Sequence, residues 1–169
     1  MNQKKMTGVK AKKDNFQDYY KLKCDENNIY WSGHKNKPDK EKLEKWYLEN
    51  ISLNTRLFFL FYEVISNDII GYLYMDFVGN NNDTIETGHG VHSDKLGNRY
   101  GSSILKFGID YAIREIPGIF YFQGWIMEDN IASIKNFLRL GYNKTSETKI
   151  IEMSSGKLEK MNKYVLEIR

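Results

Sequence analysis

The sequence has little cysteine and little proline, one and two residues respectively in a chain of 169, and no long apolar run. A single cysteine, Cys24, cannot form an internal disulfide and suits a reducing cytosol. The basic N-terminal segment lacks the apolar stretch of a secretory signal, and no segment approaches the roughly 20 apolar residues that cross a bilayer. We therefore expect one domain over residues 1–169, in the cytoplasm, with no membrane partner.

Excess charge of one sign is also missing. The 25 basic and 22 acidic residues give a net charge of +3, which is too small for a dedicated nucleic-acid binder, so no nucleic-acid partner is expected. Most lysines read as solvated surface, although a few can attract an anionic ligand. Aromatic residues, in contrast, are abundant at 14%. They indicate a core or a pocket that is rich in flat rings.

The order of the local patterns predicts a mixed sheet between helices. Helical spacing follows Asp14 and Pro38, which predicts two helices joined by a loop at residues 28–37. The later elements are three strands, a helix, a strand, a helix and a C-terminal hairpin, at residues 56–65, 67–83, 84–92, 101–115, 119–126, 129–141 and 143–168. This order indicates an α+β fold with three layers, α/β/α.

One helix begins on an unusually bare loop. Residues 94–113 read DKLGNRYGSSILKFGIDYAI, so two glycines lead directly into an apolar helical repeat. A strand that enters a helix through such a loop presents free backbone N–H groups and a positive dipole end, which suit an anion such as a diphosphate. The spacing matches neither a P-loop nor a Rossmann fingerprint. Taken alone, the loop is equally consistent with a plain strand-to-helix connection.

Two segments together resemble motifs of the GNAT superfamily of N-acetyltransferases. VHSDKLGNRYGSSILKFGIDYA resembles the family's first motif, whose loop reads Gln/Arg-x-x-Gly-x-Gly/Ala, and Gly101 matches its last small residue. EDNIASIKNFLRLGY resembles the segment that follows it in the family, with four matching residues at Asn130, Ile134, Gly141 and Tyr142. The resemblance covers residues 55–142 well and the whole chain loosely.

This resemblance implies a fold, a cofactor and a reaction. The fold is a mostly antiparallel sheet of about six to seven strands with about four helices. It divides into acceptor-side helices at about 14–50, a coenzyme-binding core at about 55–142 and a hairpin at about 143–169. The cofactor is acetyl-CoA, with no metal, and a primary amine attacks the thioester directly. The partner is a small-molecule amine, and the protein is a monomer or a homodimer.

The resemblance also assigns residues to the coenzyme. The main-chain amides of Gly97 to Ser102 would cradle the diphosphate. The loop departs from the motif at two places, because Leu96 replaces the usual Gln or Arg and Arg99 replaces the usual Gly. A side chain at Arg99 could add a cation to a phosphate. The residues expected to bind the cofactor are Val91, His92, Leu96, Gly97, Asn98, Arg99, Tyr100, Gly101, Ser102, Asn130, Ser133 and Phe137.

Amine acetylation needs a base, a donor for the oxyanion and a path for the thiolate. Glu86 is the expected base, as in similar family members, although it could be a structural carboxylate. His89 and His92 are its rivals, and His89 faces away from Glu86 on a regular strand. The amide near Val91 is the family's usual oxyanion donor. Phe137 stands where many relatives carry a tyrosine that protonates the thiolate.

The acceptor is the least determined part. The residues expected to bind it are Trp31, Ser32, His34, Tyr72 and Glu86. A short likeness of the WSG segment to acetyltransferases of bacterial glycan pathways favours a nucleotide-linked amino sugar or another small amine. Alternatives are a protein N-terminal or lysine acetyltransferase, a non-catalytic CoA-binding module, and a sensor or scaffold without a thioester ligand. Acidic residues at the mouth of the cleft would favour a peptide.

Overall fold

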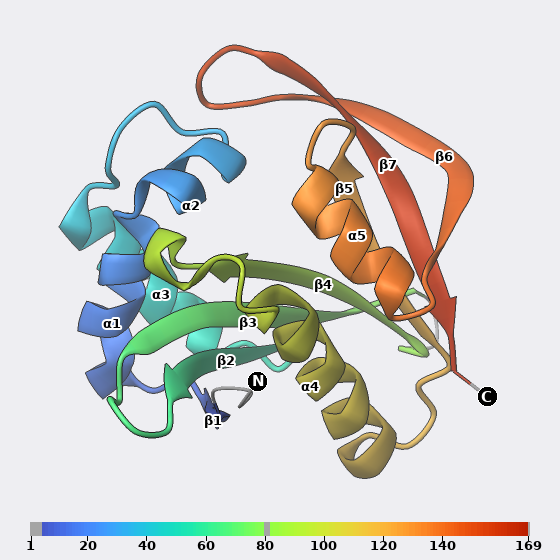
Figure 1. Cartoon of the computed structure of the whole chain (residues 1–169), viewed down its shortest axis with the longest axis horizontal. Coiled ribbons are helices and arrows are strands. Elements are labelled where there is room, and N and C mark those ends of the chain that lie inside the picture. The colour runs from blue at the N-terminus through green and yellow to red at the C-terminus, as the bar shows by residue number, and fades with distance from the viewer. Residues whose placement is uncertain (1–4, 80–81, 169) are drawn as a thin grey trace.

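A computed structural model describes residues 5–79 and 82–168 of the chain (Figure 1). Its sheet has seven strands: β1 (Met6–Lys10), β2 (Arg56–Glu63), β3 (Ile69–Val78), β4 (Thr84–Val91), β5 (Tyr121–Met127), β6 (Asn143–Glu152) and β7 (Leu158–Glu167). Its α-helices are α1 (Phe16–Lys23), α2 (Glu26–Trp31), α3 (Lys40–Ile51), α4 (Tyr100–Glu115) and α5 (Ile131–Arg139). The expected mixed α+β architecture is confirmed.

The sheet opens in its middle, between β4 and β5. The strand order is β1-β2-β3-β4-β5-β7-β6, and β4 with β5 is the parallel pair while the other neighbours run antiparallel. The parallel pairing covers three residue pairs and ends at Glu86 and Gln123. Beyond that point the two strands separate (Figure 1). The rest of β4, up to Val91, therefore has a neighbour only on the β3 side.

Helices cover both faces of the sheet, and each face has its own core. Packing of α4 and α5 on one face buries a cluster that includes Leu73, Ile104 and Phe137. On the other face, α1 and α3 bury a largely aromatic cluster around Tyr19 and Tyr47. Successive residues of β2 point alternately into the two clusters, so its continuous apolar run is explained by burial on both sides.

Three local predictions were wrong. Residues 28–37 are not all loop, because α2 extends to Trp31; the Asp25 side chain caps this helix by accepting from the Asn28 N–H at 3.2 Å. The edge strand β1 was not predicted. The expected helix cap at Asp14 lies instead in a short 3-10 turn before α1. Among the described residues, no helix has the length and apolar character to span a membrane.

Candidate functional site

Two adjoining cavities lie where β4 and β5 separate. The larger has a volume of about 470 Å³ and is lined by residues of α2, the end of β4, the loop before α4, and α5. The smaller has a volume of about 130 Å³ and reaches between β4, β5 and β7. Four residues line both cavities: Trp31, His89, Asn130 and Ser133. The two cavities can therefore hold one extended ligand together with a second molecule.

The loop before α4 presents unpaired backbone donors to the larger cavity. The first backbone hydrogen bond of α4 runs from Ser103 N to Arg99 O, at 3.1 Å. For the N–H groups from Gly97 to Ser102, no acceptor is present in the part of the chain that the structure describes. The loop turns through two left-handed residues, Gly97 at φ +78° and Arg99 at φ +62°. The bare helix start predicted from the sequence therefore exists.

The charge on the wall of the larger cavity has a single sign. Four basic residues line it, Lys95, Arg99, Lys135 and Arg139, and within residues 5–79 and 82–168 no acidic residue does. Lys95 is already paired, since its Nζ lies 3.2 Å from Glu63 Oε2 and 3.3 Å from Asp68 Oδ2. The other three cations add to the positive end of the α4 dipole. This wall is complementary to a polyanion.

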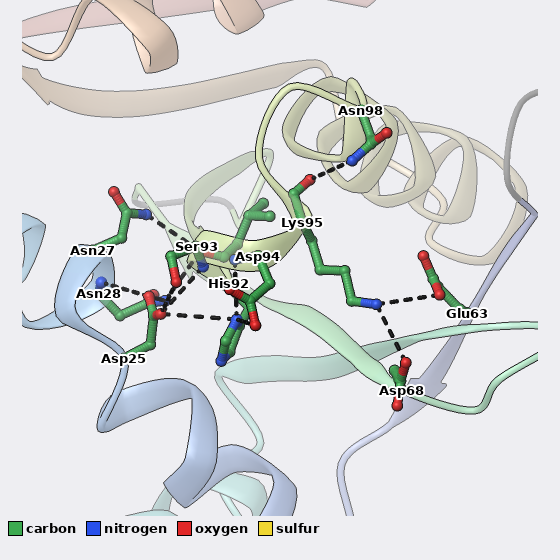
Figure 2. A network of polar contacts seen from close by, with 11 residues as sticks. Asp25, Asn27, Asn28, Glu63, Asp68, His92, Ser93, Asp94, Lys95 and Asn98 are labelled. Atoms are coloured by element: carbon green, nitrogen blue, oxygen red, sulfur yellow. Dashed lines mark hydrogen bonds and ion pairs between the residues drawn. The ribbon is translucent and has the colours of Figure 1, made fainter.

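Side chains from α2 fix the end of β4 (Figure 2). Asp25 Oδ1 accepts from the Ser93 N–H at 3.2 Å and from the Ser93 hydroxyl at 2.5 Å. Asn27 and Asn28 donate their side-chain amides to the Val91 carbonyl at 3.3 and 3.1 Å. Burial raises the pKa of Asp25, but the hydrogen bonds from Ser93 and Asn28 outweigh it and lower that pKa overall. Asp25 is therefore held as a carboxylate.

A second set of contacts fixes the same loop from the other side (Figure 2). The Asn98 amide donates to the carbonyls of Lys95 and Leu96, both at 3.2 Å. Glu63 accepts from the Tyr100 hydroxyl at 2.9 Å. Hydrogen bonds from Tyr100, from Ser66 and from Lys95 lower the pKa of Glu63 to about 2. Protein groups thus hold the loop in shape while its amides stay free for a ligand.

Free amides also follow β4 beyond the point of separation. His92 N donates to Ile70 O of β3 at 2.8 Å. Because N–H groups alternate in direction along a strand, those of Val91 and His89 point away from β3, toward the gap left by β5. The register of β4 against β3 is continuous from Thr84 to Val91, so no bulge disturbs this alternation. The Val91 amide therefore points in the direction that the sequence-based prediction requires.

Most of the residues predicted from the sequence come together at this site. The larger cavity is lined by the following predicted residues: Trp31, Ser32, Tyr72, Val91, Leu96, Gly97, Arg99, Tyr100, Gly101, Asn130 and Ser133. Phe137 lines the smaller cavity. The Asn130 side chain accepts from the Ser133 N–H at 3.1 Å, so it also caps α5.

Five predicted residues lie outside both cavity walls. Glu86 stands at the last pairing position of β4, and its Oε2 accepts from Gln123 Nε2 at 2.7 Å. His92 Nδ1 accepts from the Asp94 N–H at 3.3 Å, and the His34 side chain is exposed. Ser102 donates its hydroxyl to Arg99 O at 3.0 Å, and Asn98 bonds within the loop as described above. These five residues therefore do not line either cavity.

Several lining residues were not predicted to belong to the site. They are Asn27, Asn28, Gly90, Lys95, Ala132, Lys135, Asn136 and Arg139, together with His89, which was considered only as a rival base. The members on α5 are spaced three and four residues apart, which places them on one helix face. That spacing was a usable signal. For Asn27 and Asn28 there was none, because their helix had not been predicted.

Comparisons with known proteins give a family and a set of structural neighbours. The family model described as "Acetyltransferase (GNAT) family" matches residues 16–142. A spermidine N-acetyltransferase from Vibrio cholerae, solved with CoA and spermine, superposes with a TM-score of 0.81 at 12% identity, covering 96% of this chain and 95% of that one. No curated protein sequence matches the chain.

Two further neighbours have the same fold at low identity. A GNAT-family acetyltransferase from Streptococcus pneumoniae gives a TM-score of 0.75 at 12% identity, covering 97% of this chain and all of that one, 100%. A protein of Salmonella typhimurium, proposed to be an acetyltransferase and solved with its cofactor acetyl-CoA, gives 0.74 at 20% identity, covering 97% and 94%. At these identities the neighbours establish the fold, while the matching family model covers most of the chain.

Proposed function

The chain belongs to the GNAT family of acetyltransferases, and from that premise we propose that it acetylates a small, neutral or anionic primary amine, with a nucleotide-linked amino sugar as the leading candidate. Membership makes the protein an acetyl-CoA-dependent N-acetyltransferase. When bound, acetyl-CoA supplies a thioester whose carbonyl carbon is open to attack by an amine. The acceptor and the roles of individual residues are our proposal.

The larger cavity fits the coenzyme. The residues of its wall include Gly97, Arg99, Tyr100 and Gly101, whose main-chain amides are unpaired, and three cations without an acidic partner, Arg99, Lys135 and Arg139. These are the donors that a diphosphate needs. The absence of carboxylates from its wall, in the described part of the chain, removes the repulsion that would oppose such a ligand. We assign these residues to the phosphates, and the separated edge of β4 to the arm that carries the thioester.

The smaller cavity fits the acceptor. Two indole rings, Trp31 and Trp125, and the thioethers of Met127 and Met161 give it flat and apolar walls, which suit the face of a sugar ring. The β6–β7 hairpin reaches over this region toward α2, and Ser155 N donates to Gly33 O at 3.1 Å (Figure 1). The acceptor site is thereby bounded by segments more than 100 residues apart in sequence.

Charge distinguishes between acceptor classes. In the described residues neither cavity is lined by Asp or Glu, which disfavours a polycation and also a lysine-bearing peptide. Near the acceptor side, Lys149 Nζ lies 4.2 Å from the centroid of the Trp125 ring. Lys163 Nζ lies 5.8 Å from the same centroid but is paired with Glu147 at 3.1 Å. A phosphate group attached to the acceptor would therefore meet the Lys149 ammonium. This is the observation that carries our choice of an anionic amine.

A polyamine is the second candidate, because the Vibrio cholerae neighbour is a spermidine N-acetyltransferase. Polyamines carry several positive charges, and carboxylates are the groups that normally bind them. In the described part of the chain, the cavity walls offer no carboxylate to bind such a cation. We therefore place the polyamine second.

For the chemistry, we propose that the N–H group of Val91 stabilises the oxyanion that forms on the thioester carbonyl, because it faces the gap between the strands. Glu86 as the base remains a prediction. Its carboxylate would have to act through water, since it lies outside both cavities and bonds to Gln123.

The acceptor class can be tested by thiol release. Acetyl-CoA would be incubated with a nucleotide-linked amino sugar, the free amino sugar, spermidine and a lysine peptide at equal concentrations. We expect the highest kcat/KM for the nucleotide-linked sugar. Changing Lys149→Glu should reduce kcat/KM for that substrate at least about tenfold, and for the free sugar much less, because only the former carries phosphates. A preference for spermidine would overturn the proposed acceptor but not the acetyltransferase activity.

A further inference from the structure

His89 occupies the junction between the two cavities. It follows the last β4–β5 pair by three residues and lines both the larger and the smaller cavity. Its ring centroid lies 6.2 Å from that of Phe137 on α5. On the other side it approaches the first turn of α4, since a Cβ built on Gly101 would be 3.6 Å from His89 Nε2. The imidazole is therefore beside the gap through which the thioester arm would pass.

Both ring nitrogens of His89 are available to a ligand. In residues 5–79 and 82–168, no hydrogen-bond partner is found for Nδ1 or Nε2, and neither atom is sealed from the cavities. His92 differs, because its Nδ1 already accepts from the Asp94 N–H. Both nitrogens of His89 can therefore bond to a ligand or to solvent in the cavities.

In the smaller cavity, as far as the structure describes the chain, His89 is the side chain suited to moving a proton at neutral pH. Apart from His89, the smaller cavity is lined by Thr, Ser, Asn, Gly, Trp, Ile, Met and Phe side chains, so His89 is its single side chain that titrates between pH 4 and 10 in the described part of the chain. Phe137 cannot donate a proton, and its para carbon faces β5: a Cβ on Gly124 would lie 2.7 Å from it. The proton path that a tyrosine provides in many relatives is absent at this position.

We propose that His89 relays the proton from the attacking amine to the leaving sulfur, a role that rests on the acetyltransferase function proposed above. The neutral amine nitrogen bonds to the carbonyl carbon, and one ring nitrogen of His89 takes the proton that this nitrogen must lose. The carbon–sulfur bond then breaks, and the imidazolium gives the same proton to the sulfur. The products are an amide and a free thiol, and His89 returns to its neutral form.

The surroundings of His89 keep its ring neutral until the amine attacks. Burial lowers the pKa of His89 to about 4, so the ring is neutral and has a free lone pair at neutral pH. The charged groups on the shared cavity are Lys95 and Arg99 on the α4 side and Lys135 and Arg139 on α5; all are cations. No charged residue of β5 lines either cavity, and Leu73 faces His89 on β3. A bound diphosphate would neutralise the cations, so coenzyme binding should raise the pKa of His89.

The first test follows the proton without turnover. The His89 ring would be titrated by NMR in the free protein and with desulfo-CoA, a coenzyme analogue without the thiol. We expect its pKa to rise by one or more units with the analogue. A His89 pKa that the analogue leaves unchanged would overturn the proposal.

The second test is kinetic. His89→Gln preserves approximate size and polarity, and we expect its kcat to fall about 100-fold while KM for acetyl-CoA stays within about twofold. Added imidazole should restore part of the rate in His89→Ala. If Glu86→Gln abolishes the acidic limb of the pH–rate profile and His89→Gln retains it, Glu86 is the proton carrier and the relay is wrong. Failure of the wild type to acetylate any amine would instead reject the proposed function.

Discussion

At the scale of single residues, the loop before α4 depends on two backbone conformations of the same kind but of different cost. Gly97 and Arg99 both have positive φ, +78° and +62°. Glycine adopts this region freely, whereas an arginine there costs about 1 kcal/mol or more. Family members usually carry glycine where this chain has Arg99. A strained residue that brings a cation to the wall of the cavity indicates that binding, rather than stability, accounts for the arginine.

We therefore predict that Arg99→Gly weakens coenzyme binding but leaves stability nearly unchanged. Relief of the left-handed strain should offset the greater freedom of glycine in the unfolded chain, so the unfolding free energy should stay within about 1 kcal/mol of the wild type. The dissociation constant for acetyl-CoA should rise about tenfold, because a charge-assisted contact is lost. Arg99→Lys is the matched control, since it keeps both the charge and the strain. Calorimetry and urea unfolding measure the two quantities, and equal affinities for Gly and Lys variants would contradict the assignment.

For single residues, the sequence predicted the free backbone amides of the site better than the positions of its side chains. The unpaired amides after Gly97 could be predicted because a glycine-rich helix start has few alternatives for its N–H groups. The position of Glu86 relative to the cavities could not, because it depends on where β5 leaves β4. His89 was considered as a base only in second place, since its unpaired state depends on Phe137 and on the first turn of α4, which the sequence does not bring together.

At the scale of elements, α2 works as a clamp on the end of β4. This helix has six residues, so little of its stability comes from its own hydrogen bonds. Asp25, at its N-cap, bonds both to the helix and to Ser93, and Asn27 and Asn28 bond to Val91. These partners lie more than 60 residues away in sequence. That is why α2 was predicted as loop: its formation depends on tertiary contacts, and residues 28–37 have no helical apolar period of their own.

If α2 holds the end of β4 in place, loss of its N-cap should weaken coenzyme binding, whereas loss of the N-cap of α3 should not. Asp25→Ala and Asp39→Ala each remove an N-cap, of α2 and α3 respectively, and each should cost about 1 kcal/mol or somewhat more of unfolding free energy. Only Asp25 also bonds to Ser93, so only its loss should loosen the loop before α4 and weaken acetyl-CoA binding, by about tenfold. Asp39 bonds to the Lys42 N–H at an exposed site far from the loop contacts. Comparable affinities in the two variants, measured by calorimetry, would argue against a clamp.

At the scale of the whole molecule, the site exists because one sheet contains a single parallel pair. Five antiparallel pairings lie within the two halves of the sheet. The two halves are joined through β4 and β5, which share only three residue pairs before they diverge. The element order made a mixed sheet predictable, but the length of the parallel pairing is set by packing. Phe137 and Tyr142, in contact at a centroid distance of 4.5 Å, are buried beside β5 and are part of the core on that face. The gap is therefore bordered by the folded core on that face.

The same core leaves a signature in the pH dependence of stability. Burial lowers the pKa of His89 from 6.5 to about 4. Between pH 6.5 and pH 4, His89 is therefore protonated in the unfolded chain but not in the folded chain. Stability from this group is complete above pH 6.5 and is lost as the pH falls toward 4. Glu63 behaves likewise at lower pH: its pKa of 4.5 is lowered to about 2, and its contribution is lost in that window.

We predict two separable acid transitions in the urea-unfolding free energy as a function of pH. His89→Gln should flatten the decline between pH 6.5 and 4 and leave the decline below pH 4.5, whereas Glu63→Gln should flatten the latter and lower stability at neutral pH, because its bonds to Tyr100 and Lys95 weaken. Saturating desulfo-CoA should reduce the slope of the first window in the wild type but not in His89→Gln, since a bound diphosphate raises the folded-state pKa of His89. An unaltered slope between pH 6.5 and 4 in His89→Gln would mean that the imidazole is hydrated in the folded protein, and it would remove the electrostatic basis of the proton relay.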